Sequence, residues 1–320
     1  MSRCCVLVLC LLLPVSCRHE SPRAAGPAVP DRITRLQSEL LDPTSPHVMV
    51  AAHRACWVEG PPENSLAAIA ACVPIGADIV EIDVTLTRDG VPILLHDPTL
   101  DRTTNGTGPA SDHTLAEIRQ LRLRAAAGGP DAPLTDEKIP TLEEALELAK
   151  GRLLVNLDVK GEVFPQAYAV VHRVGVADQI LMKMNMLPDD PALADAPFLG
   201  KTMFMPIIRE CVAEPSDGVC TPRLGDVVSG FERFHPVAQE LVFATETWVR
   251  DGLASRPAHA PRIWINLLNP TMAAGMTDAR ALENPDANWG RIVSLGARVI
   301  QTDEPARLIA YLRSRGQRKD

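Results

Sequence analysis

Short apolar runs alternate with amphipathic segments along this chain from Pro46 onward. The runs have the length and composition of buried strands, and the spacing of apolar residues between them is typical of helices. Nine candidate strands lie at residues 48–52, 79–84, 92–95, 153–159, 180–184, 203–208, 241–244, 263–267 and 298–301. This alternation predicts a parallel sheet, either open or closed into an eight-stranded barrel. For a barrel one candidate is surplus, and 241–244 is the weakest.

Local signals place several helices and turns between these strands. Thr114-x-x-Glu117 and Thr141-x-x-Glu144 have the spacing of capping boxes, which open helices. The turn at residues 88–90 is too short to hold a helix, so the second and third strands are expected to be joined tightly. We interpret residues 98–140 as a short insertion after the third strand, with a helix of its own.

Composition narrows the functional classes. The chain has 320 residues, a formal net charge of −8 and 22% charged residues, values of an ordinary globular protein. They argue against disorder and against nucleic-acid binding through a basic face. With 4% aromatic residues, few side chains can stack on bases or sugar rings.

The first residues have the pattern of an export signal. Arg3 precedes an apolar run at residues 4–15, which is too short to span a bilayer. We therefore predict a signal peptide over residues 1–17, a linker over 18–46 and a single catalytic domain over 47–320. Ser16-Cys17 resembles a bacterial lipoprotein cleavage site, so either lipidation of Cys17 or simple cleavage is expected. The mature protein would be periplasmic or lipid-anchored at the bacterial cell envelope.

Four cysteines remain after the signal, in a chain whose export permits oxidation. These are Cys56, Cys72, Cys211 and Cys220. Cys211 and Cys220 flank a short segment with proline and glycine and could close a small loop. Four free thiols are an equal alternative, and the sequence does not decide between them.

Ionisable side chains follow four successive predicted strands. They are His53-Arg54, Glu81-x-Asp83, His96-Asp97 and Asn156-x-Asp158-x-Lys160. Alternation along a strand points Glu81 and Asp83 to the same side, so carboxylates from neighbouring strands should converge. Such a buried cluster needs a neutralising cation, and oxygen ligands favour Mg²⁺ or Ca²⁺, with Mn²⁺ also compatible. Singly, each acid would more often be a solvated loop residue or a helix cap.

These residues stand within a longer series of motifs. The series includes His53-Arg54, Pro62-Glu63-Asn64, Glu81-x-Asp83, Thr87-x-Asp89-Gly90, His96-Asp97, Leu100-Asp101-Arg102-Thr103-Thr104-Asn105-Gly106, Ile139-Pro140-Thr141-Leu142-Glu143-Glu144 and Thr302-Asp303-Glu304-Pro305. In order and content it resembles the glycerophosphodiester phosphodiesterase family of bacterial, exported type, over about residues 50 to 310. The resemblance implies a (β/α)8 TIM barrel.

The resemblance also implies roles for individual residues. By position, the metal ligands would be Glu63, Glu81, Asp83 and Asp158, around one divalent cation. His53 and His96 would be the acid/base pair, while Arg54 and Lys160 would contact the phosphate and Trp264 the substrate, with core packing as the alternative for Trp264. Three positions depart from the family pattern: Ala55 replaces a usual glycine, Asp158 a usual glutamate, and Trp264-Ile265-Asn266 matches its signature only in part.

The expected activity is metal-dependent hydrolysis of glycerophosphodiesters to glycerol 3-phosphate and an alcohol, through a cyclic phosphate. Its partner would be a small-molecule substrate, with no nucleic acid or protein partner predicted and membrane attachment only through a lipidated Cys17. Three alternatives stay open. One is a phospholipase-like barrel acting on intact lipids, and another is a non-catalytic protein that binds a phosphorylated ligand. A glycoside hydrolase would leave Arg54, Lys160 and both histidines unexplained.

Overall fold

Eight parallel strands close into a barrel in the computed structural model, which describes residues 31–58, 60–159, 163–211, 219–254, 256–257 and 259–319. Neighbours follow the order β1, β9, β8, β7, β6, β5, β4, β2, and β2 pairs again with β1 to complete the circle. The barrel strands are β1 (Met49–Ala52), β2 (Ile79–Leu86), β4 (Leu154–Val159), β5 (Ile180–Met184), β6 (Met203–Arg209), β7 (Ala238–Val242), β8 (Arg262–Asn266) and β9 (Ala297–Thr302). The predicted (β/α)8 barrel is confirmed.

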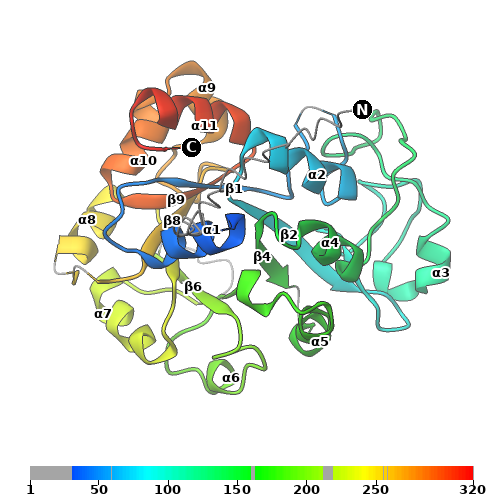
Figure 1. The fold of residues 1–320 in the computed structure, drawn as a ribbon, viewed down its shortest axis with the longest axis horizontal. Helices are drawn as coiled ribbons and strands as arrows, with labels where there is room; N and C mark the ends of the chain where they lie inside the picture. The colour runs from blue at the N-terminus through cyan, green and yellow to red at the C-terminus, as the bar shows by residue number, and fades with distance from the viewer. Residues whose placement is uncertain are drawn as a thin grey trace, which may run out of the picture. The chain divides into compact units, whose positions relative to one another are not determined.

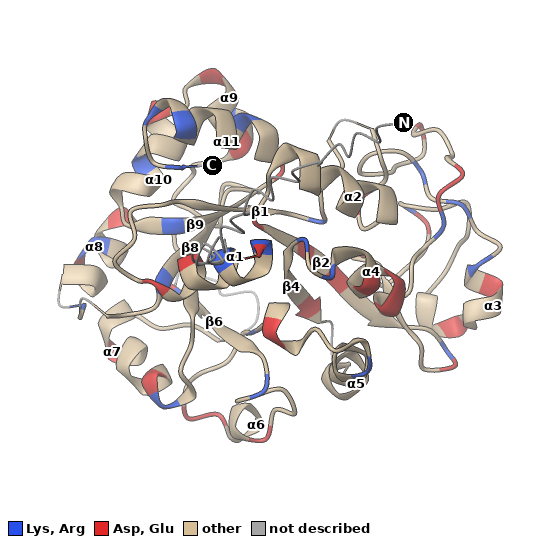
Figure 2. Ribbon diagram, viewed as in Figure 1, with Lys and Arg blue, Asp and Glu red and all other residues tan. Residues whose placement is uncertain are grey.

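Helices connect these strands around the outside of the barrel (Figure 1). They are α2 (Leu66–Ile75), α3 (Leu115–Ile118), α4 (Leu142–Ala149), α5 (Phe164–Val174), α6 (Pro191–Ala194), α7 (Leu224–Val228), α8 (Glu246–Ala254), α9 (Asp278–Glu283), α10 (Arg291–Ser294) and α11 (Pro305–Ser314). Both predicted capping boxes are present, since Thr114 and Thr141 cap α3 and α4 with Glu117 and Glu144 as reciprocal partners. Figure 2 shows acidic and basic residues interspersed over the outer helices.

The surplus strand is the third one, not the one at 241–244. β3 (Pro92–Leu94) runs antiparallel to β2, with Val84 opposite Leu94, and lies outside the barrel circle. A turn as short as residues 88–90 can join antiparallel strands only, because a parallel pair needs a long crossover. Leu241 lies within β7, which pairs with both β6 and β8. The hairpin turns the chain back, so that Leu95 donates its N–H to the Asp83 carbonyl at 3.1 Å.

Residues 98–140 share a small apolar core with β3 and the residue that follows it. It consists of Ile93, Leu95, Leu100, Ala110, Ile118, Leu123 and Ile139. Because β3 is not a barrel strand, this insertion follows the hairpin of the second barrel strand.

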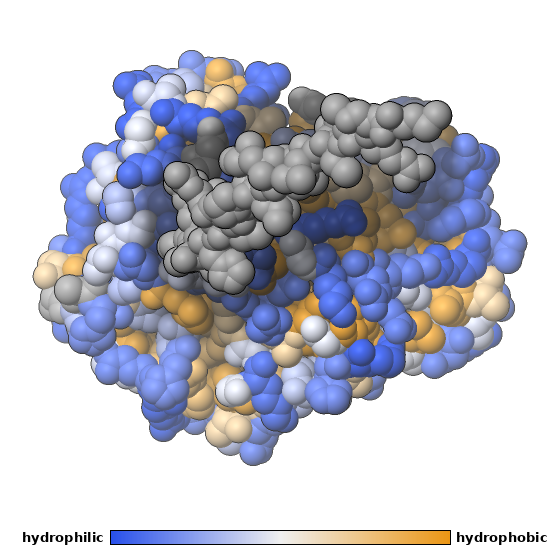
Figure 3. All heavy atoms as spheres, in the orientation of Figure 1, coloured by the Kyte–Doolittle hydropathy of each residue, from blue (hydrophilic) through white to orange (hydrophobic). Residues whose placement is uncertain are grey.

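One end of the barrel is closed by a helix that the sequence did not predict. α1 (Arg32–Leu41) begins at the N-cap Asp31, and its Ile33 and Leu40 are buried with residues from the first half of the barrel strands. Residues 31–46, predicted as linker, therefore belong to the folded unit. The linker prediction is wrong there because the apolar positions of this short helix are surrounded by charge. In Figure 3, hydrophilic residues predominate around the rim of the view and separate apolar areas lie between them.

The four cysteines form two disulfides, Cys56–Cys72 and Cys211–Cys220. The small loop considered for Cys211 and Cys220 is thus present, and the free-thiol alternative is excluded. The predicted signal peptide, with Cys17, lies outside the described residues. Among the described helices, none combines the length and apolar character needed to cross a bilayer.

Candidate active site

Three carboxylates converge where β2 and β4 end. Glu81 and Asp83 share one side of β2, and Asp158 on β4 is the register partner of Asp83. One oxygen of each carboxylate lies within 4.8 Å of the others. Glu81 and Asp83 are each 1% exposed. The convergence predicted from strand alternation is therefore present.

Charge at this cluster favours a bound cation. Burial raises the pKa of Glu81, and the negative charges of Asp83 and Asp158 raise it further, against the opposing effect of Lys183. A divalent cation would relieve both the burial cost and the repulsion. Three carboxylates form an all-oxygen donor set, which fits Mg²⁺ or Ca²⁺. These residues fit the metal ion that the sequence implies.

His53 is oriented by the carboxylate of the residue that follows the last barrel strand. Its Nδ1 lies 2.7 Å from Asp303 Oδ1, and its side chain is 14% exposed. Burial would lower the pKa of His53, but the hydrogen bond to Asp303 and the charge of Glu81 outweigh it, so the pKa is raised. A bond from Nδ1–H to the carboxylate leaves Nε2 as the nitrogen for proton transfer.

Asp303 is in turn held by Asp278, the first residue of α9. The Asp303 N–H donates to Asp278 Oδ2 at 2.9 Å, and Trp289 Nε1 donates to Oδ1 at 2.9 Å. Burial raises the pKa of Asp278 from 3.8 to about 6. Protonation of Asp278 is therefore favoured in the folded state relative to the unfolded chain.

We expect this shift to make the free energy of unfolding fall as pH rises from 4 to 6. In that range the folded state binds more protons than the unfolded state. The free energy of unfolding should therefore fall by about 3 kcal/mol in total between pH 4 and pH 6. Asp278→Asn should lack this decrease. Urea denaturation of both proteins at several pH values measures the difference, and parallel pH curves would contradict the assignment.

His96, which follows β3, also has a carboxylate partner at its Nδ1. Its Nδ1 lies 2.7 Å from Asp97 Oδ1. Arg102 donates two hydrogen bonds to Asp97, at 2.7 and 2.9 Å, and these bonds hold the pKa of Asp97 well below its usual range. The His96 side chain is 36% exposed, so it is the more accessible of the two histidines.

Glu63, predicted as a metal ligand, makes different contacts in the structure. Both of its oxygens accept hydrogen bonds from the guanidinium groups of Arg54 and Arg102, at 2.7–3.1 Å. It is not part of the three-carboxylate cluster found among the described residues. Glu63 instead links Arg102, and through it the His96–Asp97 pair, to Arg54.

The turn after β1 has an unusual backbone. Arg54 and Ala55 both have positive φ, 53° and 69°, a region that side chains with a Cβ rarely adopt. Ala55 stands where the family usually has glycine, and its φ gives the reason for that preference. Two hydrogen bonds stabilise the turn: Ala55 N–H donates to the Glu81 carbonyl, and Arg54 N–H donates to Glu81 Oε2, both at 3.1 Å.

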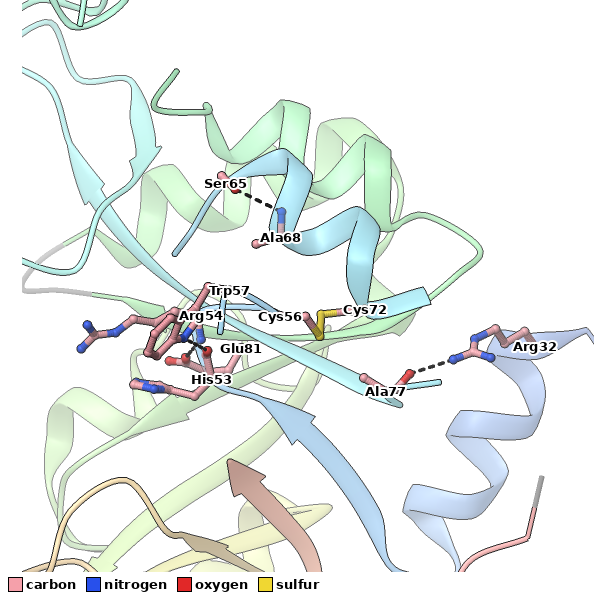
Figure 4. Close-up of a disulfide and its surroundings, with 10 residues drawn as sticks. All are labelled: Arg32, His53, Arg54, Cys56, Trp57, Ser65, Ala68, Cys72, Ala77 and Glu81. Carbon is pink, nitrogen blue, oxygen red and sulfur yellow. Dashed lines mark hydrogen bonds between the residues drawn. A yellow bond between two sulfur atoms is a disulfide. The ribbon is translucent and has the colours of Figure 1, made fainter. Parts of the chain in front are cut away.

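A disulfide anchors the residue that follows this turn. Cys56 is bonded to Cys72 on α2, next to His53, Arg54 and Glu81 (Figure 4). Through Cys72, the disulfide ties the strained Arg54–Ala55 turn to α2, the helix whose N-cap is Ser65. The bond therefore constrains the segment that carries two predicted site residues.

Replacing Cys56 and Cys72 together by alanine should lower the free energy of unfolding by about 3 kcal/mol, as expected for a loop of about 15 residues. It should also lower kcat, because the Arg54–Ala55 turn loses a constraint. Urea denaturation and steady-state kinetics, with reduced wild-type protein as the control, measure both effects. An unchanged unfolding midpoint would show that the bond carries no stability.

The remaining predicted residues are placed as follows. Lys160 lies outside the described residues. Trp264 is fully buried in the barrel interior and donates from Nε1 to Asn266 and Gln301. The structure thus favours core packing for Trp264 over a contact with substrate.

Sequence reasoning gave no role to Asp97, Arg102, Asp303 or Glu240. Asp97 and Asp303 stood within the motif series, next to a predicted histidine and just after a strand, so their position was a usable signal. Arg102 stood in the series too, but its carboxylate partners, Asp97 and Glu63, belong to two other motifs of that series. Glu240 is buried on β7, within a run that the sequence had not extended so far toward the N-terminus.

Known proteins match this chain in two segments. Residues 53–189 match the model of the glycerophosphoryl diester phosphodiesterase family, and residues 204–312 match a domain of unknown function. Human glycerophosphodiester phosphodiesterase 1 is 39% identical over 157 residues, covering 45% of this chain and 47% of that protein. The glycerophosphodiester phosphodiesterase of Caldanaerobacter subterraneus is 42% identical over 116 residues, covering 36% and 46%. The chain thus spans about half the length of these curated relatives.

Solved structures show the same fold. A glycerophosphoryl diester phosphodiesterase from Parabacteroides distasonis has a TM-score of 0.68 at 23% identity, covering 88% of this chain and 92% of that one. An Oleispira antarctica phosphodiesterase in complex with the product sn-glycerol-3-phosphate has a TM-score of 0.57 at 24% identity, covering 83% and 96%. At such identities the likeness concerns the fold alone. Residues 53–189, the segment that matches the model of the glycerophosphoryl diester phosphodiesterase family, hold both histidines and all three clustered carboxylates.

Proposed function

We propose that this protein hydrolyses glycerophosphodiesters to glycerol 3-phosphate and an alcohol. One observation carries the proposal: two histidine–aspartate pairs directly adjoin residues that bond to the three-carboxylate cluster. His53 precedes Arg54, whose N–H donates to Glu81. His96 follows Leu95, whose N–H donates to the Asp83 carbonyl. The C-terminal ends of the strands are where barrel enzymes carry out their chemistry. The curated relatives are named as phosphodiesterases of this kind, which supports the same reaction here.

In the proposed mechanism, His53 and His96 transfer the protons. One imidazole removes the proton from the substrate's glycerol 2-hydroxyl, whose oxygen forms a bond to phosphorus. The other protonates the leaving alcohol as its phosphorus–oxygen bond breaks. Water then opens the cyclic phosphate, with the two imidazoles exchanging roles. Asp303 and Asp97 keep the rings oriented with Nε2 toward the substrate.

Charge on the phosphate is balanced by this chain's cations and by a metal ion. Glu81, Asp83 and Asp158 would hold the metal, and Glu63 would join them as a fourth ligand by exchanging a hydrogen bond with Arg54 or Arg102 for the ion. When bound, a divalent cation neutralises negative charge that develops on the phosphoryl oxygens. Arg54 and Lys160 are proposed to contact those oxygens. The Arg54 guanidinium is held in position by its Nη1, which donates to Glu63 Oε1 at 3.1 Å.

The order of bond formation can be tested with a substrate analogue. A glycerophosphodiester whose 2-hydroxyl is replaced by hydrogen lacks the proposed nucleophile, so the protein should release no alcohol from it. The analogue should still inhibit hydrolysis of the normal substrate, because its phosphate is intact. Turnover of the analogue at a normal rate would mean that water attacks phosphorus directly.

We also propose export, with attachment at Cys17. The apolar run before Cys17 supports a signal, and the two disulfides fit an oxidising compartment outside the cytoplasm.

A further inference from the structure

Lys183 places a permanent positive charge beside the metal-site carboxylates. It lies on β5, on the same side of the strand as Leu181, which faces the barrel interior. Its side chain is 6% exposed. The ammonium Nζ lies 3.4 Å from Asp158 Oδ2 and 3.5 Å from Glu81 Oε1. Two of the three clustered carboxylates that would bind the metal ion are therefore already ion-paired with this lysine.

A third acid, outside the three-carboxylate cluster, also pairs with Lys183. Glu240 on β7 is 3% exposed, and its Oε2 lies 3.9 Å from Lys183 Nζ. Its Oε1 accepts a hydrogen bond from Asn266 Nδ2 at 2.9 Å, and Asn266 Oδ1 accepts one from Trp264 Nε1 at 2.7 Å. Since Trp264 is fully buried, Glu240 is fixed in place. Its Oε2 is buried and has no hydrogen-bond partner within the described part of the chain.

This arrangement gives the ammonium two alternative acceptors. It lies closer to Glu81 and Asp158, and a change of its flexible side chain can bring it from 3.9 Å to hydrogen-bond distance of Glu240 Oε2. A divalent cation at the cluster would repel it in that direction. Without a metal, the ammonium reduces repulsion among the buried carboxylates.

We propose that Lys183 is a resident cation that competes with the metal ion for Glu81 and Asp158, and that Glu240 receives it when the metal binds. Lys183 and Glu240 are thus positioning residues that set metal affinity. The inference rests on the proposed function for the existence of the metal site. Its claims concern the affinity of that site for a metal ion and can be tested without measuring hydrolysis.

The two members of the pair should have opposite effects on affinity. Lys183→Met removes the competitor, so Ca²⁺ should bind the full chain about tenfold more tightly than wild type. Glu240→Gln removes the anion that draws the ammonium away, so Ca²⁺ should bind about tenfold more weakly. Isothermal titration calorimetry with Ca²⁺ alone measures both. Equal or weaker binding by Lys183→Met, or tighter binding by Glu240→Gln, overturns the proposal.

The double variant covers the case in which Lys183→Met leaves Glu240 unpaired and does not fold. Removing both charges should give an affinity between those of wild type and Lys183→Met, and an affinity no tighter than wild type would overturn the proposal. Arg262→Met is the matched control. Arg262 is as buried as Lys183 but pairs with Glu39 at the α1 end of the barrel, so its loss should lower the melting temperature without changing the Ca²⁺ affinity.

The same titrations separate this inference from the proposed function. If wild type binds no Ca²⁺ but Lys183→Met does, the competition is supported and the metal requirement of the wild-type reaction fails. If neither binds, the inference itself is overturned. If the affinities rank as expected but glycerol 3-phosphate is not released, only the proposed activity fails.

Discussion

Replacing His53 by alanine is expected to lower kcat/KM for glycerophosphodiester hydrolysis by about 100- to 10,000-fold, the usual contribution of a general acid or base. The imidazole is the only group of this side chain that can exchange a proton near neutral pH. His96→Ala should have an effect of the same size. The double variant should be little worse than either single one, because residues that act in one proton-transfer sequence are not additive.

The matched control is His172→Ala. His172 is an exposed histidine in the last turn of α5, outside the proposed site. Its loss should leave kcat/KM within twofold of wild type. Near-normal turnover by His53→Ala, in protein whose melting temperature is unchanged, would remove His53 from the mechanism.

Asp83→Asn is expected to have the second large effect, lowering Ca²⁺ or Mg²⁺ affinity by at least about 100-fold. Changes to groups that only orient metal ligands already cost 10–100-fold, and this change removes a charge from the ligand set itself. Activity at low metal concentration should fall in parallel. The amide is similar in shape and can still pair with Asn64, whose Nδ2 donates to Asp83 Oδ2 at 2.9 Å, so the fold should persist.

Glu143→Gln controls for the loss of a carboxylate. Glu143 is exposed on α4 and pairs with Arg173, so its neutralisation should change neither metal affinity nor turnover. Raising the metal concentration should partly restore the activity of Asp83→Asn, whereas His53→Ala should not respond. A normal metal affinity in Asp83→Asn would show that the cluster does not bind the ion.

The alternation of strands and helices could be predicted because its signals are local, whereas closure into a barrel was implied only by the family resemblance. Each strand is a short apolar run, and Thr114 and Thr141 open helices through contacts within three residues. The predictions for residues 31–46 and for the third strand were wrong because these segments depend on contacts with distant parts of the chain. α1 has few apolar positions, and its folding depends on the barrel end that buries Ile33 and Leu40. The direction of β3 followed from the length of its turn, which strand composition does not reveal.

The part of the site that depends on local pattern was also predictable. Period-two alternation placed Glu81 and Asp83 on one side of β2, and strand order brought Asp158 beside them. Contacts between distant segments were not predictable in this way. Glu63 is held by Arg102, and Lys183 by Glu240, through pairings that only the closed barrel creates. Burial likewise separates Trp264 from the substrate-facing end, although its strand position alone allowed either role.

Release of glycerol 3-phosphate by the full chain is the most direct test of the proposed hydrolysis. Several glycerophosphodiesters would be supplied after chelation and again with Mg²⁺ or Ca²⁺ restored, beside His53→Ala. The proposed function predicts release that requires the metal ion and is lost in the variant. Folded wild-type protein that releases no glycerol 3-phosphate with either metal, or that releases it equally well in His53→Ala, would contradict it.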